Sequence, residues 1–554
     1  MADPIHSSVT FSNRNRKSFA DRLRSEVFDL LVIGGGITGC GIALDAALRG
    51  MKVALVEKDD FASGTSSRST KLIHGGLRYL KQFDLRLVRE VGRERAVVHR
   101  NARHLVLPEK MLLPLLRNGS LGRRSCSLGL RVYDFLAGVE RPERRVMLDR
   151  QATLAAEPLL DKSRLLGGAL YYEYRTDDSR LTIEIAKSAH VEGAVLLNYV
   201  EALSFRRDSP GQITGIEAHD VLANRQLRIR ARIVVNAAGP WVDALRKKDD
   251  DAAPRRLQLT KGVHLAFPYA RLPLRQALYF DGEGGRMIFA IPRLPVTYVG
   301  TTDTLHHESP DAPRCDREDA DSLLRAANAM FPSLKLRREE AVSSWAGLRP
   351  LILEEGKAAS ELSRRDEIMR SPSGLLSIAG GKLTGYRRMA ERIVDLVAKR
   401  LGGAWRDCRT CDHRLSGGDF KSEETFQAAL QHFMEEGSRL QLPRDRIREW
   451  FFRYGTNTSV LLAHLRDRSP SLPCAEETLN DIELSYTLDH EMVAHPGDFL
   501  IRRTGDMLFE RARAEKRIES ATRSIAEELD LPSSVAARQL SEIRAEFHAA
   551  LDFL

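Results

Sequence analysis

Three absences in the sequence narrow the classes of protein to which the chain can belong. Only 6 of the 554 residues are cysteines, too few for a disulfide framework, so a reducing compartment is expected. No apolar run approaches the roughly 18–20 residues that span a bilayer, so the chain is expected to lie on a membrane at most. Residues 1–24 are polar and basic and lack the apolar centre of a signal peptide; they predict a flexible leader.

The charge of the chain favours anionic partners. The formal net charge is +9, and the basic residues are spread along the sequence. A phosphorylated metabolite and an acidic lipid surface would both satisfy this charge. No helix-turn-helix pattern and no basic motif with interleaved aromatic residues stands out, so no nucleic-acid partner is expected.

The stretch FDLLVIGGGITGCGIALDAALRGMKVALVEK, residues 28–58, follows the order strand, glycine turn, helix and strand. Gly34, Gly36 and Gly39 have the G-x-G-x-x-G spacing, which provides a tight turn, close approach to a pyrophosphate and close helix–strand packing. The N–H groups at the helix N-terminus can bind phosphate. Glu57, at the tip of the second strand, suits a ribose hydroxyl. This pattern predicts a dinucleotide site for NAD or FAD.

Other segments extend this predicted site. A loop rich in serine and threonine follows Glu57, a small-residue break interrupts VVNAAGPWVD, and LLSIAGGKLTGYRRMA repeats the order strand, glycine turn and helix. The N-terminus of that last helix would stabilise negative charge on a reduced flavin. Because only one convincing fingerprint is present, a flavin is favoured over a nicotinamide–flavin pair. The cofactor-binding residues predicted in these segments are Thr65, Ser66, Ser67, Ala238, Gly239, Gly381, Lys382, Leu383 and Thr384.

Several motifs carry a resemblance to a known family. They are SSRSTKLIHGGLRYL (66–80), VVNAAGPWVD (234–243), KGVHLAFP (261–268), GTTDT (300–304), GLRPL (347–351) and GGKLTGYRRMA (380–390). With the glycine turn, they resemble the flavin-dependent glycerol-3-phosphate dehydrogenases of the aerobic, membrane-associated type, within the D-amino-acid-oxidase-like flavoproteins. The resemblance extends over residues 28–504. It implies FAD as cofactor, sn-glycerol 3-phosphate as substrate and dihydroxyacetone phosphate as product.

The resemblance also implies candidate catalytic residues. His264 lies on the face of strand 257–267 opposite its most apolar side chains, and its position favours a general base over a structural histidine. Arg349 is the leading phosphate clamp. Lys382 is expected near substrate or flavin, and Lys71 and His74 near the isoalloxazine ring. Each of these basic residues alone is more often a solvated charge.

For the electron acceptor, the resemblance implies a membrane quinone and a peripheral location on the cytoplasmic face of the cell membrane. The segment from Lys110 to Gly138 mixes leucines with arginines and predicts a basic amphipathic helix. Such a helix lies in an anionic membrane interface or packs on the core with a solvated basic face. Oxidases that use oxygen, amine or amino-acid oxidases and a flavin-binding protein without turnover are the alternatives. A homodimer is one expected assembly.

The predicted fold class is α/β. A Rossmann-like FAD-binding domain (residues 25–110, 170–250 and 340–405) is interleaved with a β-rich, membrane-facing substrate domain (111–169 and 251–339). A separate α-helical domain follows at residues 419–554. Cys408-x-x-Cys411 lies in the linker with His413 nearby, but no second ligand pair has zinc spacing, so no metal site is expected.

Overall fold

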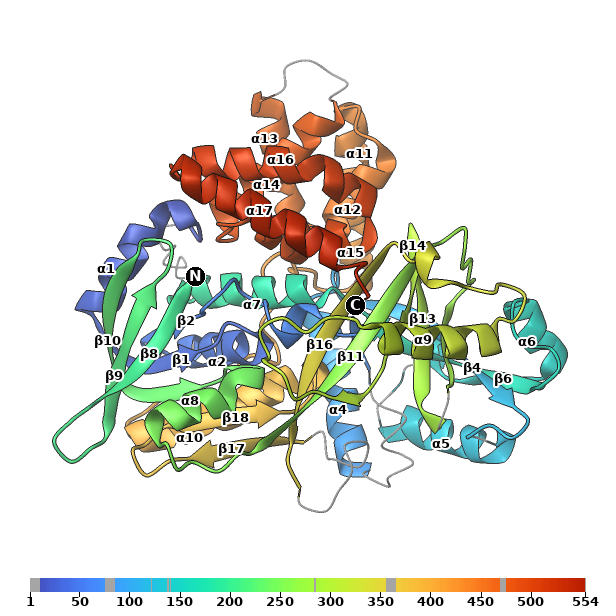
Figure 1. The fold of residues 1–554 in the computed structure, drawn as a ribbon, viewed down its shortest axis with the longest axis horizontal. Helices are drawn as coiled ribbons and strands as arrows, with labels where there is room; N and C mark the ends of the chain where they lie inside the picture. The colour runs from blue at the N-terminus through green and yellow to red at the C-terminus, as the bar shows by residue number, and fades with distance from the viewer. Residues whose placement is uncertain are drawn as a thin grey trace.

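The computed structural model describes residues 10–74, 85–120, 122–136, 139, 141–282, 285–354, 365–468 and 475–553. Two sheets lie side by side, and a group of C-terminal helices lies above them (Figure 1). The predicted α/β fold with a separate C-terminal helical domain is confirmed.

The first sheet has a parallel centre in the order β18, β10, β1, β2 and β7, with β17 antiparallel at one edge. In this parallel centre, β2 and β7 are apolar and buried throughout, as parallel strands covered by helices usually are. The strands are β1 (Val27–Ile33), β2 (Val53–Val56), β7 (Val195–Leu197), β8 (Val200–Arg207), β9 (Ile213–Asp220), β10 (Arg225–Asn236), β17 (Asp366–Arg370) and β18 (Leu376–Gly380).

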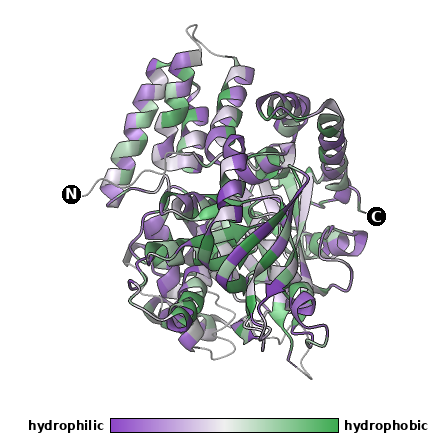
Figure 2. Cartoon of the chain, turned by 90° about the vertical axis from the view of Figure 1, so that its left-hand side faces the viewer, coloured by the Kyte–Doolittle hydropathy of each residue, from purple (hydrophilic) through white to green (hydrophobic). Residues whose placement is uncertain are grey.

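Helices pack against this sheet and bury their apolar residues there. In α2, all residues from Gly39 to Leu48 are buried, because the helix lies between the sheet and the helices α7 and α10. The helices around this sheet are α1 (Arg16–Ser25), α2 (Ile37–Leu48), α4 (Leu85–Asn101), α7 (Asp178–Val191), α8 (Val242–Asp249) and α10 (Tyr386–Leu401). Hydrophobic residues follow the strands and the inner helix faces (Figure 2).

The second sheet is mixed and contains the substrate-domain strands. Its central order is β15, β11, β14, β13, β12, β4, β6 and β3, with β16 paired to β11 and β5 paired to β6. The strands are β3 (Leu72–Ile73), β4 (Leu107–Leu116), β5 (Val146–Leu148), β6 (Leu165–Arg175), β11 (Leu257–Pro268), β12 (Ala277–Asp281), β13 (Met287–Arg293), β14 (Val296–Gly300), β15 (Thr304–Leu305) and β16 (Ser343–Ile352). Beside them lie α5 (Arg123–Leu136), α6 (Arg150–Ala156) and α9 (Arg317–Met330).

The C-terminal domain is helical and has its own cores around Trp450 and Phe499. A π-helical turn, Asp498–Arg503, interrupts it. Its helices are α11 (Glu423–Arg439), α12 (Arg444–Tyr454), α13 (Thr458–Arg468), α14 (Glu476–His490), α15 (Asp506–Phe509), α16 (Arg511–Glu528) and α17 (Ser533–Ala549).

The predicted flexible leader is wrong for the residues that the structure describes there. Residues 16–25 form α1, and Phe19 and Leu23 are buried in the first core. Arg16 is also buried, and its guanidinium donates to Asp220 with Nη2–Oδ1 at 2.7 Å. Residues 1–9 of the predicted leader lie outside the described residues.

Two of the predicted domain boundaries also need correction. The strand β16 was expected in the FAD-binding domain, yet it pairs along its whole length with β11 of the second sheet. The strand β6 likewise continues to Arg175 within the second sheet. These pairings join residues that are 49 to 95 positions apart in sequence, and the local sequence pattern of a strand does not specify its partner.

Candidate functional site

A cavity of about 1290 Å³ lies where the two sheets meet. It is larger than the 300–1,000 Å³ typical of a small-molecule pocket and can accommodate a dinucleotide together with a small substrate. Its walls come from the first glycine turn, the loop after β2, the turns after β10 and β18, the strands β11 and β16, and α5. The predicted residues that line it are Gly34, Gly36, Glu57, Thr65, Ser66, His74, Ala238, Gly239, His264, Arg349, Gly381, Lys382, Leu383 and Thr384.

The first glycine turn has the predicted local structure. Gly34 has φ +113°, and a Cβ there would lie 2.6 Å from the carbonyl oxygen of Ala237. A Cβ on Gly39 would lie 1.9 Å from the carbonyl oxygen of Gly34. Gly39 therefore does not line the cavity but allows α2 to pack closely on β1, so that the N-terminus of α2 faces the cavity.

Glu57 lies at the end of β2, and its carboxylate accepts two backbone hydrogen bonds. Gly35 N lies 2.6 Å from Oε2, and Asp59 N lies 3.0 Å from Oε1. Burial raises the pKa of Glu57 to about 7, although both hydrogen bonds favour the ionised form. Hydrogen bonds from ribose hydroxyls would further favour the carboxylate over the protonated acid.

The loop after Glu57 brings hydroxyl groups to the same place. Ser66 Oγ accepts a hydrogen bond from Ile37 N at 2.9 Å, at the N-terminus of α2. Thr65 Oγ1 donates to Leu348 O at 2.6 Å and ties the loop to β16. Ser67 is buried and does not line the cavity, so its predicted contact with the cofactor is not supported. The other contacts predicted for this loop fit a cofactor on the α2 N-terminus.

Three residues that the sequence does not single out lie together in the cavity wall beside Glu57. Lys58 Nζ lies 2.7 Å from Asp311 Oδ1 and 4.3 Å from the ring centroid of Trp241. Trp241 Nε1 donates to the same carboxylate oxygen at 2.8 Å. An aromatic ring held by an ion pair is a suitable cover for a nucleoside. Lys58 follows Glu57 directly, whereas Asp311 comes from the other domain.

His264 is buried in the cavity wall, where its imidazole is held from two sides. Its ring lies parallel to Trp345, and Nε2 lies 3.0 Å from Thr70 Oγ1. Among the described residues, Nδ1 has no hydrogen-bond partner. Burial lowers the pKa of His264 well below its usual value, and the charges of Arg349 and Lys71 lower it further. The neutral imidazole, which can accept a proton, is therefore the stable form.

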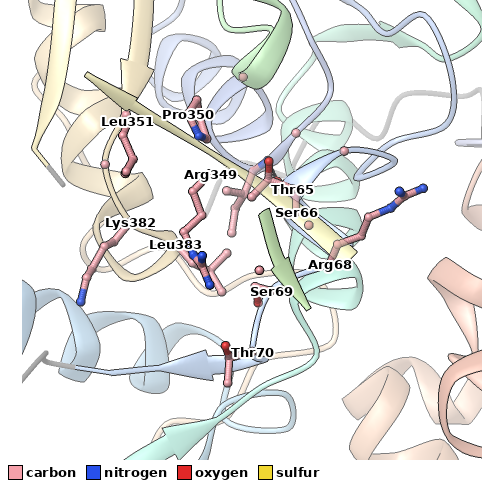
Figure 3. A pocket seen from close by; sticks show the side chains of 18 of the residues that line it. Thr65, Ser66, Arg68, Ser69, Thr70, Arg349, Pro350, Leu351, Lys382 and Leu383 are labelled. Atoms are coloured by element: carbon pink, nitrogen blue, oxygen red, sulfur yellow. Dashed lines mark hydrogen bonds between the residues drawn. The ribbon is translucent and has the colours of Figure 1, made fainter. Parts of the chain in front are cut away.

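Arg349 lies beside His264 because glycine faces it on the neighbouring strand. A Cβ on Gly262 would lie 2.2 Å from Arg349 Nη2, so the guanidinium crosses β11 where a side chain is missing. Its Nη1 donates to Thr302 O and Asp303 Oδ1, each at 3.1 Å, and Nη2 donates to Thr301 Oγ1 at 2.9 Å. These hydrogen bonds fix the guanidinium in one orientation. Figure 3 shows the Arg349 side chain among the residues that line the cavity.

Asp303 and the two threonines before it are not among the predicted site residues. They belong to the GTTDT motif, which carries part of the family resemblance. That motif could have indicated that these residues belong to the site. Thr70 and Trp345, which hold His264, also lie within or beside recognised motifs. Nothing in their residue types alone points to a role in the site.

The catalytic role predicted for Lys71 is not supported. Lys71 is 1 % exposed and does not line the cavity. Its ammonium forms an ion pair with Asp178 at 2.5 Å and donates to Ser67 O at 3.0 Å. A buried ammonium needs such a partner, and Asp178, at the start of α7, supplies it. Lys71 therefore stabilises the loop.

His74 and Lys382 do line the cavity. The His74 ring lies edge-on to Phe289 with centroids 5.9 Å apart, and its carbonyl accepts a hydrogen bond from Thr384 Oγ1. In the view of Figure 3, Lys382 extends away from Arg349. Residues 75–80 of the motif that contains His74 lie outside the described residues.

The cavity continues to α5, and its wall becomes apolar there. Leu113, Leu130 and Phe289 belong to this part of the lining. Leu128 also lines it and is 64 % exposed, so α5 forms the rim of the cavity. Phe135, two turns further along, is 85 % exposed.

The remaining sequence features give no second site. Cys408 Sγ lies 3.1 Å from Thr410 Oγ1, and Cys411 Sγ lies 3.1 Å from Asp412 Oδ2. Within the described ranges, no cluster of three or more His, Cys, Asp or Glu side chains could hold a metal ion. No helix of the described residues is long and apolar enough to cross a membrane.

The residues that line the cavity can be compared with those that FAD requires. Glycine backbone lies where a pyrophosphate would approach, a buried carboxylate lies at the ribose position, and the turn before α10 (residues 382–385) forms the opposite wall. The glycine turn and the carboxylate belong to the pattern by which dinucleotides bind such sheets. The residues present therefore fit FAD.

Comparison with known proteins agrees with this geometry. Residues 29–387 match the family model of FAD dependent oxidoreductases, and residues 408–534 match the C-terminal domain of alpha-glycerophosphate oxidase. The chain is 47% identical over 552 residues to the aerobic glycerol-3-phosphate dehydrogenase of Staphylococcus haemolyticus, which covers 98% of each chain. It is 49% identical over 506 residues to the Staphylococcus aureus protein of the same name, covering 90% of this chain and 91% of that one.

A solved structure is similar over the whole chain. The glycerol-3-phosphate dehydrogenase from Bacillus halodurans, complexed with FAD, has a TM-score of 0.84 and 43% identity, covering 98% of this chain and 99% of that one. The L-alpha-glycerophosphate oxidase from Mycoplasma pneumoniae shares the fold, with a TM-score of 0.54 and 18% identity over 69% of this chain and 96% of that one. The chain therefore belongs to the FAD-dependent oxidoreductases, in the family of the aerobic glycerol-3-phosphate dehydrogenases, and its cofactor is FAD.

Proposed function

We propose that the protein oxidises sn-glycerol 3-phosphate to dihydroxyacetone phosphate and passes the electrons to a membrane quinone. The observation that carries this proposal is the placement of Arg349 over Gly262, two residues from His264 on the same face of β11. Two residues along a strand span about 6.7 Å. That separation suits a substrate with an anionic group and a reacting hydroxyl on neighbouring carbons, and the names of the relatives agree.

Arg349 binds the phosphate in this proposal. A guanidinium forms two parallel hydrogen bonds with phosphate oxygens, and Asp303 and Thr301 hold its plane against β11. The ion pair with Asp303 fixes the guanidinium before substrate arrives, so less side-chain entropy is lost on binding. Lys382 is a further cationic residue of the cavity wall.

His264 takes the proton of the substrate C2 hydroxyl. Its lowered pKa keeps the imidazole neutral and ready to accept a proton. Trp345 and Thr70 fix the ring, and burial keeps water from the transfer. When bound, FAD supplies the chemistry that the side chains lack, since it accepts the C2 hydrogen with its electron pair. The N-terminal turn of α10 faces the same cavity and favours negative charge there.

The exposed face of α5 supports the proposed acceptor and location. Its solvent face carries Arg124, Leu128, Arg131 and Phe135, all exposed, and lies at the side of the molecule away from the C-terminal helices (Figure 1). Exposed apolar residues alternating with arginines suit an anionic membrane surface. We therefore place the protein on the cytoplasmic face of the cell membrane, where a quinone reaches the apolar end of the cavity.

Anaerobic mixing tests the proposal. sn-Glycerol 3-phosphate should reduce the bound flavin, seen as loss of its visible absorbance, whereas amino acids should not. A soluble quinone should then restore the absorbance faster than oxygen does. Reduction by amino acids would overturn the substrate assignment, and faster reoxidation by oxygen would identify an oxidase.

A further inference from the structure

The C-terminal domain contacts a loop of the cofactor site, residues Glu57 to Ala62. This loop is bonded at both ends to the first glycine turn. Gly35 N donates to Glu57, and Ala62 N donates to Gly35 O at 3.0 Å. Phe61, within the loop, is fully buried, and a Cβ on Gly35 would lie 2.7 Å from its ring. The loop therefore sets the position of Glu57 and the shape of the turn that receives the pyrophosphate.

Asp60 lies at the centre of this loop and is fully buried. Two consecutive arginines from the π-helical turn of the C-terminal domain hold it. Arg502 Nε donates to Oδ2 at 2.6 Å, while Arg503 donates from Nη1 to Oδ2 at 2.6 Å and from Nη2 to Oδ1 at 3.0 Å. Asn198 Nδ2, from the end of β7, also donates to Oδ1 at 3.1 Å.

The arginines are themselves oriented by the C-terminal domain. Arg502 donates to Asp498 Oδ1 at 2.6 Å, and Arg503 donates to the backbone oxygen of Glu491 at 2.5 Å. Arg503 is fully buried, and Arg502 is 9 % exposed. Burial alone would raise the pKa of Asp60, but Arg503 and Arg502 lower it below the usual value. The carboxylate is therefore ionised and depends on both arginines for compensation.

A domain contact that served only to join two domains could lie anywhere on their interface. This one lies three residues from Glu57, on a loop with no other cationic partner for Asp60 among the described residues. π-Helical turns are rare and are common at functional sites. Here the turn brings two adjacent arginine side chains to one carboxylate.

We propose that Arg502 and Arg503 are positioning residues of the FAD site, and that the C-terminal domain sets FAD affinity by holding Asp60. Neither arginine touches the cavity. Both act through the Glu57–Ala62 loop. Because binding linkage is reciprocal, bound FAD in turn strengthens the docking of the C-terminal domain. The inference rests on the cofactor and not on the substrate or the electron acceptor.

The test compares FAD release from the holoenzyme of Asp60→Asn with that of a matched variant. Arg103→Met removes another ion pair between the two domains, since Arg103 Nη1 donates to Glu423 Oε2 at 3.0 Å and Arg103 contacts neither the loop nor the two arginines. FAD release is followed by the fluorescence of free flavin after dilution. We expect release from Asp60→Asn to be about tenfold faster than from the unsubstituted protein, while Arg103→Met releases FAD at the unsubstituted rate.

Thermal unfolding separates this role from simple domain docking. Both variants should unfold at lower temperature, but only Asp60→Asn should lose FAD before the protein unfolds. Equal rates of FAD release from the two variants would overturn the proposal. If Asp60→Asn does not fold, Arg502→Lys keeps the charge and loses the forked geometry. It should release FAD several times faster, and an unchanged rate would overturn the proposal.

Discussion

Trp345 lies against His264 with ring centroids 4.8 Å apart and an angle of 10° between the planes. The two residues are directly opposite each other on β16 and β11. Trp345 Nε1 donates to Ser69 O at 3.2 Å, and Phe509 of α15 packs edge-on against Trp345 with centroids 5.8 Å apart. The imidazole therefore has a fixed orientation.

Replacing Trp345 should disturb the orientation of His264. For Trp345→Leu we expect flavin reduction at saturating substrate to slow by about 10- to 100-fold, because small misplacements of a catalytic group are costly. Stopped-flow measurement of flavin absorbance gives this rate. Phe280→Leu is the control, since Phe280 is equally buried in the same sheet but packs against Phe331. Equal rates of flavin reduction in the two variants would mean that Trp345 stabilises the hydrophobic core but does not orient His264.

The pH dependence should report the lowered pKa of His264. The neutral base is present above its pKa, so lowering the pKa extends activity toward acid, and the acidic limb of kcat/KM should lie below pH 6.5. Arg349→Ala removes one cause of the shift, so this limb should move to higher pH. In His264→Ala, the rate of flavin reduction by substrate should be lower by about 100-fold or more. An acidic limb that persists unchanged in His264→Ala would assign it to another group.

Arg349 should act mainly on substrate binding. Arg349→Ala should raise KM by about 10- to 100-fold, because a charged hydrogen-bond donor to the phosphate is lost, while FAD stays bound. The KM of Arg349→Lys should lie between the values of the unsubstituted protein and of Arg349→Ala, since an ammonium keeps the charge but lacks the two-point geometry. Arg271→Ala removes a comparable ion pair, with Glu340, outside the cavity and serves as the control. Unchanged steady-state kinetics in Arg349→Ala would contradict the clamp.

Glu57 should make FAD binding depend on pH. Its raised pKa, about 7, means that the carboxylate becomes protonated as pH falls through neutrality in the FAD-free protein. Only the ionised form accepts from both ribose hydroxyls, so FAD affinity should fall between pH 8 and pH 6. Glu57→Gln should bind more weakly at all pH values and without this dependence. Equilibrium titration with FAD measures both, and a flat profile for the unsubstituted protein would contradict the ribose assignment.

The exposed face of α5 should hold the protein on anionic vesicles. Leu128→Ser with Phe135→Ser should weaken binding to phosphatidylglycerol-containing vesicles by about tenfold or more, given the apolar area withdrawn from water. Co-sedimentation gives the bound fraction. Leu203→Ser with Val221→Ser replaces two exposed apolar residues on the first sheet and should have no effect. Equal losses in both pairs would indicate nonspecific adhesion.

Patterns that are local in the sequence could be predicted well. The turn at Gly34 and Gly39 could be predicted because glycine is required where backbone atoms lie that close. The strand face that carries His264 could be predicted from two-residue alternation, which is a property of the strand itself. The helical character of the C-terminal domain likewise follows from its own composition.

Features that depend on distant partners could not be predicted. The charge of Lys71 suggested a catalytic group, but its partner Asp178 lies 107 residues away. Residues 16–24 were predicted to belong to a flexible leader, because only tertiary packing reveals that Phe19 and Leu23 are buried. The sequence also does not show that Asp303 forms an ion pair with Arg349. In each case, a contact between residues far apart in the sequence determines the role of the side chain.

Leu128 belongs at once to the outer face of α5 and to the wall of the cavity. Any surface that binds the outer face of this helix therefore also lies at the entrance of the cavity. Binding of a surface to α5 and entry of small molecules into the cavity consequently depend on the same residue. A substitution at Leu128 that weakens the first should also alter the second.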